Sequence, residues 1–357
     1  MSSLPARFLA TPLGLELPII QAPMAGVSST EMAAAVSNAG GLGSIAVGVL
    51  DAEAAAREIA KLRTLTARPF NVNVFCHEPA RRDDAIETAW LARLRPVFER
   101  FGEWPPARLA EPFTSFHAND ALLAVLVNAR VPVVSFHFGA PTHAQVLALR
   151  AAGSVLMATA TSLDEACRLI DAGVDIVIAQ GIEAGGHRGV FDAHAFDEGL
   201  GTLALTRLLA TRLDRPIVAA GGIMNGSDIA MALRHGARAV QMGTAFLATD
   251  ESTASPAHRA ALVDTPTLMT RVLSGRPARA LANELTRLGE GIPEAGIPPF
   301  PLAYDATRAL DALARSCRNT HFGAHWAGRG ATRTRAMPAG ALVAVLAREL
   351  VDATRLQ

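Results

Sequence analysis

Eight short apolar runs, separated by segments with a helical pattern, constrain this 357-residue chain more than any other feature of its sequence. The runs are apolar throughout rather than alternating, which is typical of strands covered on both faces. They lie at Leu17–Met24, Leu42–Val47, Phe70–Phe75, Val131–Phe138, Ser154–Ala160, Asp175–Gly181, Pro216–Gly222 and Ala239–Phe246. Eight β/α units in unbroken succession predict an α/β fold, a parallel (β/α)8 TIM barrel.

The main alternative fold is an open, doubly wound sheet. That fold would place a Gly-x-Gly-x-x-Gly turn after its first strand. The first strand here ends instead in Gln21-Ala-Pro-Met-Ala-Gly26, which favours the barrel. The segments between strands have helix signals, for example at Thr30–Ala39, where Ser28 and Glu31 predict a capping box.

Two long segments do not fit the β/α repeat. We expect residues 1–75 and 131–250 to form the barrel, and residues 76–130 and 251–357 to form a largely helical subdomain. Placed over the C-terminal mouth of the barrel, that subdomain would exclude water and shape a substrate pocket. The alternative is that these segments bury an oligomer interface.

Composition excludes several classes of function. Thirty-three basic residues balance thirty-three acidic ones, so no net charge favours nucleic acid or an acidic membrane. Three scattered cysteines, no apolar run of membrane-span length and no signal-peptide pattern predict a cytoplasmic protein. We expect a monomer or a homodimer, although nothing in the sequence decides between them. The single lysine, Lys61, lies in a charged helical pattern, which argues against Schiff-base or pyridoxal-phosphate chemistry.

The sixth strand leads into a glycine-rich loop, Gln180-Gly-Ile-Glu-Ala-Gly-Gly-His-Arg-Gly189. Loops after barrel strands hold the reactive groups of such enzymes, and His187 is the side chain best suited to exchange protons near neutral pH. A solvated histidine in a plain turn is the alternative.

Glycines also end the seventh and eighth strands. Gly221-Gly222, followed by Asn225-Gly-Ser-Asp228 and a helix, and Gly243-Thr244 offer free amides where barrels often bind phosphate. Asn71 and Gln180 carry amides that both donate and accept, which suits the edge of an isoalloxazine or a nucleobase. No metal-ligand spacing competes, so FMN is the predicted cofactor.

These motifs together resemble the FMN-dependent nitronate monooxygenase family, formerly called 2-nitropropane dioxygenases. The resemblance covers nearly the whole chain and rests on the first-strand segment, Asn38-Ala-Gly-Gly-Leu-Gly43, Pro69-Phe-Asn-Val-Asn73, Val134-Ser-Phe-His-Phe-Gly139, the sixth-strand loop, Ala219-Ala-Gly-Gly-Ile223 and Val240-Gln-Met-Gly-Thr244. It implies oxidation of an alkyl nitronate, with propionate 3-nitronate the expected substrate, by O2 to a carbonyl compound and nitrite. It further implies a flavin semiquinone and no requirement for NAD(P)H.

The resemblance also assigns residues. The flavin would be held by Ala22, Pro23, Met24, Asn71, Gln180, Gly185, Gly186, Gly221, Gly222, Gln241, Met242, Gly243 and Thr244. His187 would be catalytic, taking the α-proton of a neutral nitroalkane, and His137, Arg188 and Tyr304 would line the substrate pocket. A protonated His187 or Arg188 could hold the nitro oxygens, although Arg188 could instead pair with Glu183, and His137 and Tyr304 could serve packing alone.

Three other functions fit the same barrel. The nearest is an NAD(P)H-dependent FMN reductase of quinones or of enoyl-acyl carrier protein. More distant are a flavin-free isomerase or lyase of a phosphorylated substrate, and a flavin-binding protein without turnover.

Overall fold

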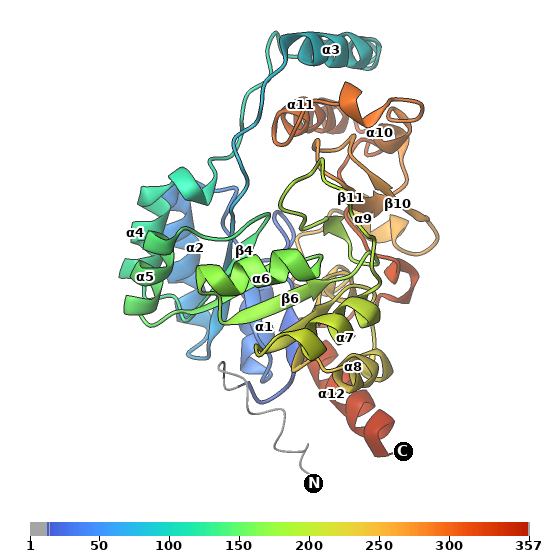
Figure 1. The fold of residues 1–357 in the computed structure, drawn as a ribbon. Coiled ribbons are helices and arrows are strands. Elements are labelled where there is room, and N and C mark those ends of the chain that lie inside the picture. Colours follow the sequence, from blue (N-terminus) through green and yellow to red (C-terminus); the bar gives the residue numbers. More distant parts are fainter. Residues whose placement is uncertain (1–12, 14, 356–357) are drawn as a thin grey trace.

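Eight parallel strands form one sheet that closes on itself in the computed structural model, which describes residues 13 and 15–355 (Figure 1). In sheet order they are β1 (Ile19–Gln21), β9 (Ala239–Met242), β8 (Ile217–Ala220), β6 (Ile176–Gln180), β5 (Val155–Ala160), β4 (Val133–His137), β3 (Phe70–Phe75) and β2 (Gly43–Ala46). An isolated parallel bridge between Ile20 and Leu42 joins the first strand to the last. All eight predicted strands are confirmed, and with them the TIM barrel.

The strands are continuously apolar because both of their faces are buried. Ile20, Met157, Ile178 and Val218 pack together in one cluster inside the barrel. The other face of the strands packs on the surrounding helices, for example Val72 and Val134 against Leu62 of α2.

Eight helices surround the barrel. They are α1 (Thr30–Asn38), α2 (Ala52–Leu65), α4 (Asp120–Asn128), α5 (His143–Ala151), α6 (Leu163–Ala172), α7 (Thr202–Arg212), α8 (Gly226–Arg234) and α12 (Ala339–Arg355). The predicted capping box at α1 is wrong in its position: Ser29 is the N-cap and accepts from the amide of Met32, whereas the Ser28 hydroxyl accepts from the amide of Met24.

Two of these helices come from segments expected to lie outside the barrel. Helix α4, from the first long segment, packs on α2 and α5, and α12, from the tail, packs on α8 and α1. Helix α12 therefore occupies the place of the eighth barrel helix, and one helix from each long segment packs on the barrel helices.

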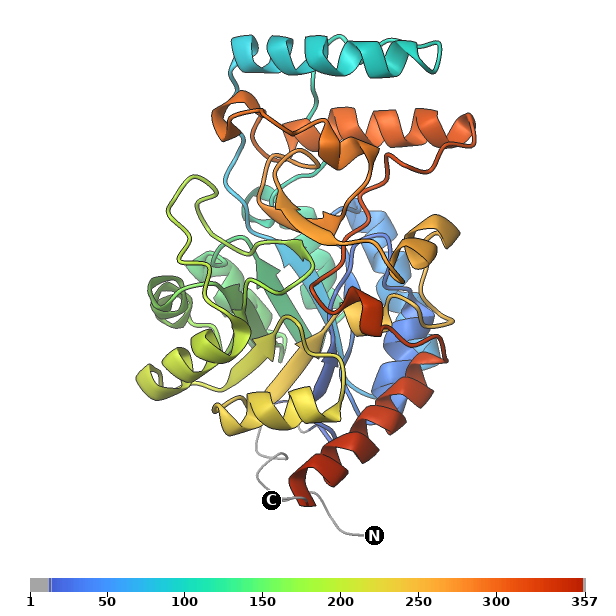
Figure 2. The ribbon, with the colours of Figure 1, turned by 90° about the vertical axis from the view of Figure 1, so that its right-hand side faces the viewer.

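The remaining parts of both segments form a cap, which we define as α3 (Asp84–Glu99), α10 (Glu284–Arg287), α11 (Leu302–Ser316) and the strands β10 (Thr267–Thr270) and β11 (Ala278–Leu281). Figures 1 and 2 both show α3 lying beside α11 at the end of the molecule away from α12. Trp90 and Leu94 of α3 share one buried cluster with Leu302 and Leu310 of α11. The short helix α9 (Pro256–Ala261) precedes the cap strands.

A three-stranded antiparallel sheet joins the cap to the barrel. Strand β11 pairs with β10 on one side and with β7 (Gly186–His187), from the loop after β6, on the other. This sheet was not predicted, because β7 has only two residues and its partner lies about ninety positions later. In the described part of the chain, no helix is long and apolar enough to cross a membrane.

Candidate active site

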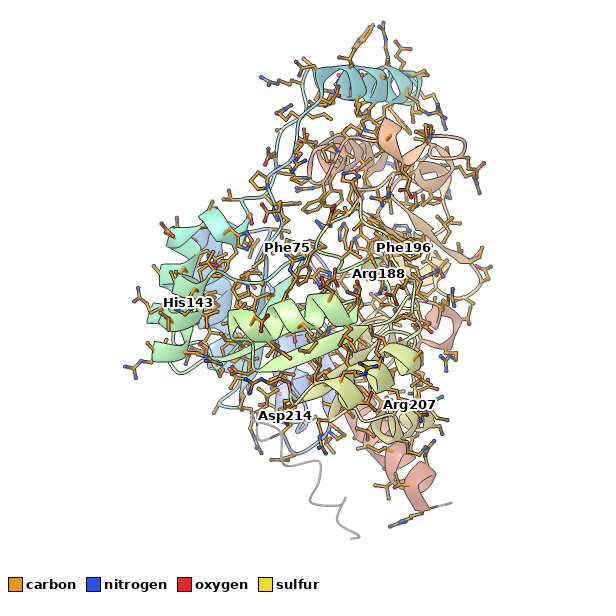
Figure 3. The ribbon with its side chains drawn as sticks, in the orientation of Figure 1. Phe75, His143, Arg188, Phe196, Arg207 and Asp214 are labelled. Atoms are coloured by element: carbon orange, nitrogen blue, oxygen red, sulfur yellow. The ribbon has the colours of Figure 1, made fainter. Side chains whose placement is uncertain are left out.

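A cavity of about 440 Å³ lies between the C-terminal ends of the barrel strands and the cap. Its floor is formed by residues at or just after the strands, from Ala22 after β1 to Thr244 after β9. Its roof contains Phe113, Phe300, Tyr304 and Trp326. Phe75, at the end of β3, is one of the lining residues, and Figure 3 shows it on the side of the barrel that faces the cap. Asp214 lies at the opposite end of the barrel in the same figure.

Most of the predicted site residues do line this cavity. They are Ala22, Pro23, Met24, His137, Gln180, Gly185, Gly186, His187, Gly221, Gly222, Gln241, Met242, Gly243, Thr244 and Tyr304. Two predicted residues, Asn71 and Arg188, are not among its lining residues.

Asn71 lies deeper in the barrel than the residues that line the cavity. Its side chain is fully buried, and Nδ2 donates to the hydroxyls of Ser44 and Ser135, at 3.1 and 2.9 Å. Asn73 lines the cavity instead and donates to the Ser135 carbonyl at 3.1 Å. Residues two apart in a strand share a face, so both amides point into the barrel, and Oδ1 of Asn71 is buried without a partner. The role of Asn71 at the cofactor stays a prediction.

Arg188 is a structural residue of the loop after β6. It is 2% exposed and makes a bidentate ion pair with Asp197, with Nε–Oδ2 2.7 Å and Nη2–Oδ1 2.9 Å. A further bond from Nη1 reaches the Gln180 carbonyl. Its charge is paired with Asp197 rather than with Glu183, and its side chain is not among those that line the cavity.

The floor after β8 and β9 has free backbone donors. Within the described chain, the amides of Gly222, Ile223, Gly243 and Thr244 have no hydrogen-bond partner. The side-chain oxygen Oε1 of Gln241 is also buried without a partner. An unpaired buried polar atom such as Gln241 Oε1 is costly, and with the free amides that line the same cavity it marks a place for a polar ligand.

The N-terminus of α8, by contrast, is already occupied by the protein's own carboxylates. Glu349 of α12 accepts from the Gly226 amide at 2.9 Å, and Asp228 accepts from the Met224 amide at 2.9 Å. The amides of Met224 and Gly226 are thus taken up within the protein, and the contribution of the Asn225–Asp228 segment to a phosphate site stays a prediction. The free amides lie elsewhere, at Gly222 and Ile223 directly after β8 and at Gly243 and Thr244 directly after β9.

His187 is buried between the cavity and the cap. Its Nε2 lies 2.8 Å from the hydroxyl of Ser274, and its ring packs on Trp326 and Phe300, with ring centroids 4.9 and 5.5 Å away. Burial, followed by the nearby charges of His137 and Arg276, lowers the pKa of His187 to about 3. The ring is therefore neutral at physiological pH, and a protonated His187 does not hold the nitro oxygens in the resting protein.

The backbone of the His187 loop is held from three sides. Residue 187 pairs with Ala278 of β11, the Arg188 amide donates to the Pro277 carbonyl at 2.8 Å, and Gln180 Nε2 donates to the His187 carbonyl at 3.0 Å. Arg276 adds a bond to the Phe191 carbonyl at 2.9 Å. The tail and the loop thus position His187 together.

His137 lies beside this loop and lines the cavity. Its Nε2 is 3.4 Å from the His187 carbonyl, and burial lowers its pKa to about 4. A neutral ring at a strand end, next to the cavity, fits a lining role.

Sequence reasoning missed four residues of the roof. Phe113, Phe300 and Trp326 supply aromatic surface, and Arg308 is the single Asp, Glu, Lys or Arg side chain among the described residues that line the cavity. None of them follows a barrel strand, so the rule that located the floor could not find them.

The nitronate monooxygenase family model matches residues 7–349 of this sequence. This chain belongs to the nitronate monooxygenase family. It is 51% identical to the nitronate monooxygenase of Paraburkholderia phytofirmans, over 96% of this chain and 95% of that protein. The identity to the nitronate monooxygenase of Pseudomonas aeruginosa is 50%, over 95% and 97% of the two chains.

Two solved structures superpose on nearly the whole of this chain. The nitroalkane oxidase from Streptomyces ansochromogenes superposes with a TM-score of 0.88 and 42% identity, covering 96% of this chain and 98% of that one. FabK from Thermotoga maritima superposes with a TM-score of 0.72 and 26% identity, covering 96% of each chain. The resemblance seen in the sequence is confirmed, and the chain is an enzyme of this oxidoreductase family.

Proposed function

We propose that this enzyme oxidises alkyl nitronates with O2, using FMN held on the floor of the cavity, and that it releases a carbonyl compound and nitrite without needing NAD(P)H. The observation that carries the proposal is a cavity with two distinct halves. The floor has unpartnered backbone and amide groups, and the roof is aromatic and places His187 at their boundary. The family of the chain supports the same reaction.

The floor fits a flavin mononucleotide. The amides of Gly222, Ile223, Gly243 and Thr244 would bind the phosphate as donors, and Gln241 Oε1 would accept from a donor of the ring or ribityl chain. Ala22, Pro23 and Met24 would pack beside the ring. Bound FMN would supply the electron transfer between the nitronate and O2.

The protein's own part is to bind, orient and dehydrate the substrate. A nitronate is already deprotonated at carbon, so no base is needed to oxidise it. Neutral His187 has one ring nitrogen that donates and one that accepts, so it can hold a nitro oxygen or take the α-proton of a neutral nitroalkane. The aromatic roof excludes water and thereby strengthens these polar contacts.

Arg308 supports propionate 3-nitronate as the substrate. It lies on α11 at the mouth of the cavity, 5.4 and 5.8 Å from the ring centroids of Phe113 and Tyr304, and forms no ion pair with any described residue. Arg315 on the same helix is neutralised by Asp311, with Nε–Oδ1 3.0 Å. A free guanidinium at the mouth suits a substrate whose far end carries a carboxylate.

Oxygen consumption by the purified, FMN-supplemented protein tests the proposal. Propionate 3-nitronate without nicotinamide should cause rapid O2 uptake with nitrite release. No uptake, together with flavin bleaching by NADH, would instead assign the protein to the reductases.

A further inference from the structure

Ser274 is a fully buried hydroxyl that the proposed reaction does not use. It lies in the turn between β10 and β11, is 0% exposed, and places Oγ 2.8 Å from Nε2 of His187. The other bond to Oγ comes from the Arg276 amide, at 3.4 Å. This serine is the only polar side chain of the described residues that bonds the His187 ring.

The hydrogen bonds around the Ser274 hydroxyl determine whether Ser274 Oγ or His187 Nε2 is the donor in the bond between them. The Arg276 N–H donates to Oγ, so the serine oxygen already accepts one bond. The serine's own hydrogen needs an acceptor, and His187 Nε2 is the one that the described residues offer. If Nε2–H donated instead, a buried O–H would be left without a partner, which is unfavourable.

It follows that Nε2 is the acceptor and that neutral His187 carries its proton on Nδ1. No described residue bonds Nδ1, and the ring lines the cavity, so Nδ1–H is the group left for a ligand. Burial keeps the ring from taking a second proton near neutral pH, since its pKa is about 3. In this tautomer His187 offers the cavity a donor, and it can act as a base only after its proton has moved from Nδ1 to Nε2.

We propose that Ser274 is a positioning residue that fixes His187 as the Nδ1–H tautomer, so that the histidine donates a hydrogen bond to a nitronate oxygen and discriminates against neutral nitroalkanes. The selectivity follows from the proton balance. Oxidising a neutral nitroalkane requires breaking its α-C–H bond and moving the proton to Nδ1, which must first be unprotonated. That requires the other tautomer, in which the Ser274 hydrogen loses its acceptor. The consequence for substrate choice rests on the proposed nitronate oxidation, whereas the tautomer does not.

His137 provides an internal comparison. Its Nε2 faces the His187 carbonyl at 3.4 Å, and a carbonyl can only accept, so neutral His137 carries its proton on Nε2. Two adjacent neutral histidines are thus expected to hold opposite tautomers, which a single spectrum can test.

The first experiment measures the tautomer directly. In the FMN-supplemented holoenzyme with ¹⁵N-labelled histidine, long-range ¹H–¹⁵N spectra distinguish protonated from unprotonated ring nitrogens, and His187→Asn and His137→Asn assign the two rings. We expect Nδ1–H at His187 and Nε2–H at His137. A protonated Nε2 at His187 would overturn the proposal, whether or not the enzyme oxidises nitronates.

The second experiment measures selectivity. Ser274→Ala should lower kcat/KM for a nitronate about 10-fold and leave kcat/KM for its parent nitroalkane unchanged or higher, so that their ratio shifts on the order of 10-fold. Ser274→Thr keeps the hydroxyl and should restore the ratio. The matched control is Thr307→Val, which removes a buried hydroxyl that donates to the Leu273 carbonyl without touching His187. Equal losses on both substrates in Ser274→Ala, as in a merely destabilised protein, would reject the selectivity role.

Discussion

The floor of the cavity presents mainly backbone groups, whereas its roof presents side chains. The floor depends on glycines and free amides directly after the barrel strands, such as Gly222 and Gly243. The roof depends on residues brought from distant parts of the chain, such as Phe113 and Trp326. A backbone floor suits one fixed cofactor, and a side-chain roof can vary with the substrate. Changes in the two halves should therefore have different consequences.

The largest expected effect is at His187, where the two halves meet. His187→Asn keeps a hydrogen-bond donor but has no basic nitrogen, so turnover of a neutral nitroalkane should fall about 10²- to 10⁴-fold. Turnover of the preformed nitronate should fall about 10-fold or less, since it needs no proton transfer. Steady-state kinetics with a nitroalkane and its nitronate, measured before they interconvert, would check this. Equal losses would remove any proton-transfer role from His187.

The junction between floor and roof should tolerate no added atom. A Cβ at Gly185 would lie 2.4 Å from the Gly328 amide nitrogen and 2.5 Å from the Ala327 carbonyl carbon, which are backbone atoms. Gly185→Ala should therefore destabilise the protein by about 3 kcal/mol and weaken FMN retention. Urea unfolding and flavin fluorescence would measure both.

The control for this variant is the next residue. Gly186 has φ +74° and no atom within 4 Å of an added Cβ, so Gly186→Ala should cost only about 1 kcal/mol of backbone strain. A loss of only about 1 kcal/mol in both variants would show that the segment at Ala327 and Gly328 can move away from the loop without cost.

Acid should destabilise the protein through its buried histidines. Burial lowers the pKa of His77, His137, His258 and His325 to about 4, and that of His187 to about 3. Between pH 6.5 and 4 the unfolded chain binds protons that the folded protein does not, so the stability present above pH 6.5 is lost as pH falls. Each histidine contributes up to about 1.4 kcal/mol per pH unit.

His258, on α9, offers a test of this pH dependence, because it does not line the main cavity. Its ring stacks on that of His325, with ring centroids 4.9 Å apart. His258→Asn should make the free energy of unfolding less sensitive to pH by up to about 1.4 kcal/mol per unit between pH 6.5 and 5. An unchanged slope in denaturant unfolding would mean that this ring titrates normally in the folded protein.

The difference between the floor and the roof of the cavity also explains which parts of the site could be predicted from sequence. The eight strands and the floor follow from local patterns, because each β/α unit places the residues after its strand at one face. Gln180, Gly222 and Gln241 were located in this way. Asn71 and Asn73 lie on the same face of β3, and only Asn73 lines the cavity, because the exact end of a strand is poorly marked in sequence.

The roof and the cap sheet depend on pairings over long distances in the chain. Strand β7 pairs with β11 about ninety residues away, and Ser274 reaches His187 only through that pairing. The sequence left open whether Arg188 holds substrate oxygens or pairs with Glu183, and the structure pairs it with Asp197 instead. No periodicity or motif records such contacts, so a roof residue such as Arg308 could be recognised only in the folded structure.

The smallest expected effect is at Arg308, and it tests whether the roof selects the substrate. Arg308 is exposed at the mouth of the cavity, so water and salt screen its charge, and an ion pair there is worth about 1 kcal/mol or less. Arg308→Met should raise KM for propionate 3-nitronate about fivefold while leaving kcat and the KM of an uncharged alkyl nitronate unchanged. The effect should shrink at high ionic strength, because screening already weakens the wild-type contact. Arg315→Met, which removes a cation already paired with Asp311, is the matched control and should leave both KM values as they are. An equal rise in KM for charged and uncharged nitronates would show that Arg308 shapes the mouth of the cavity and does not bind the substrate carboxylate.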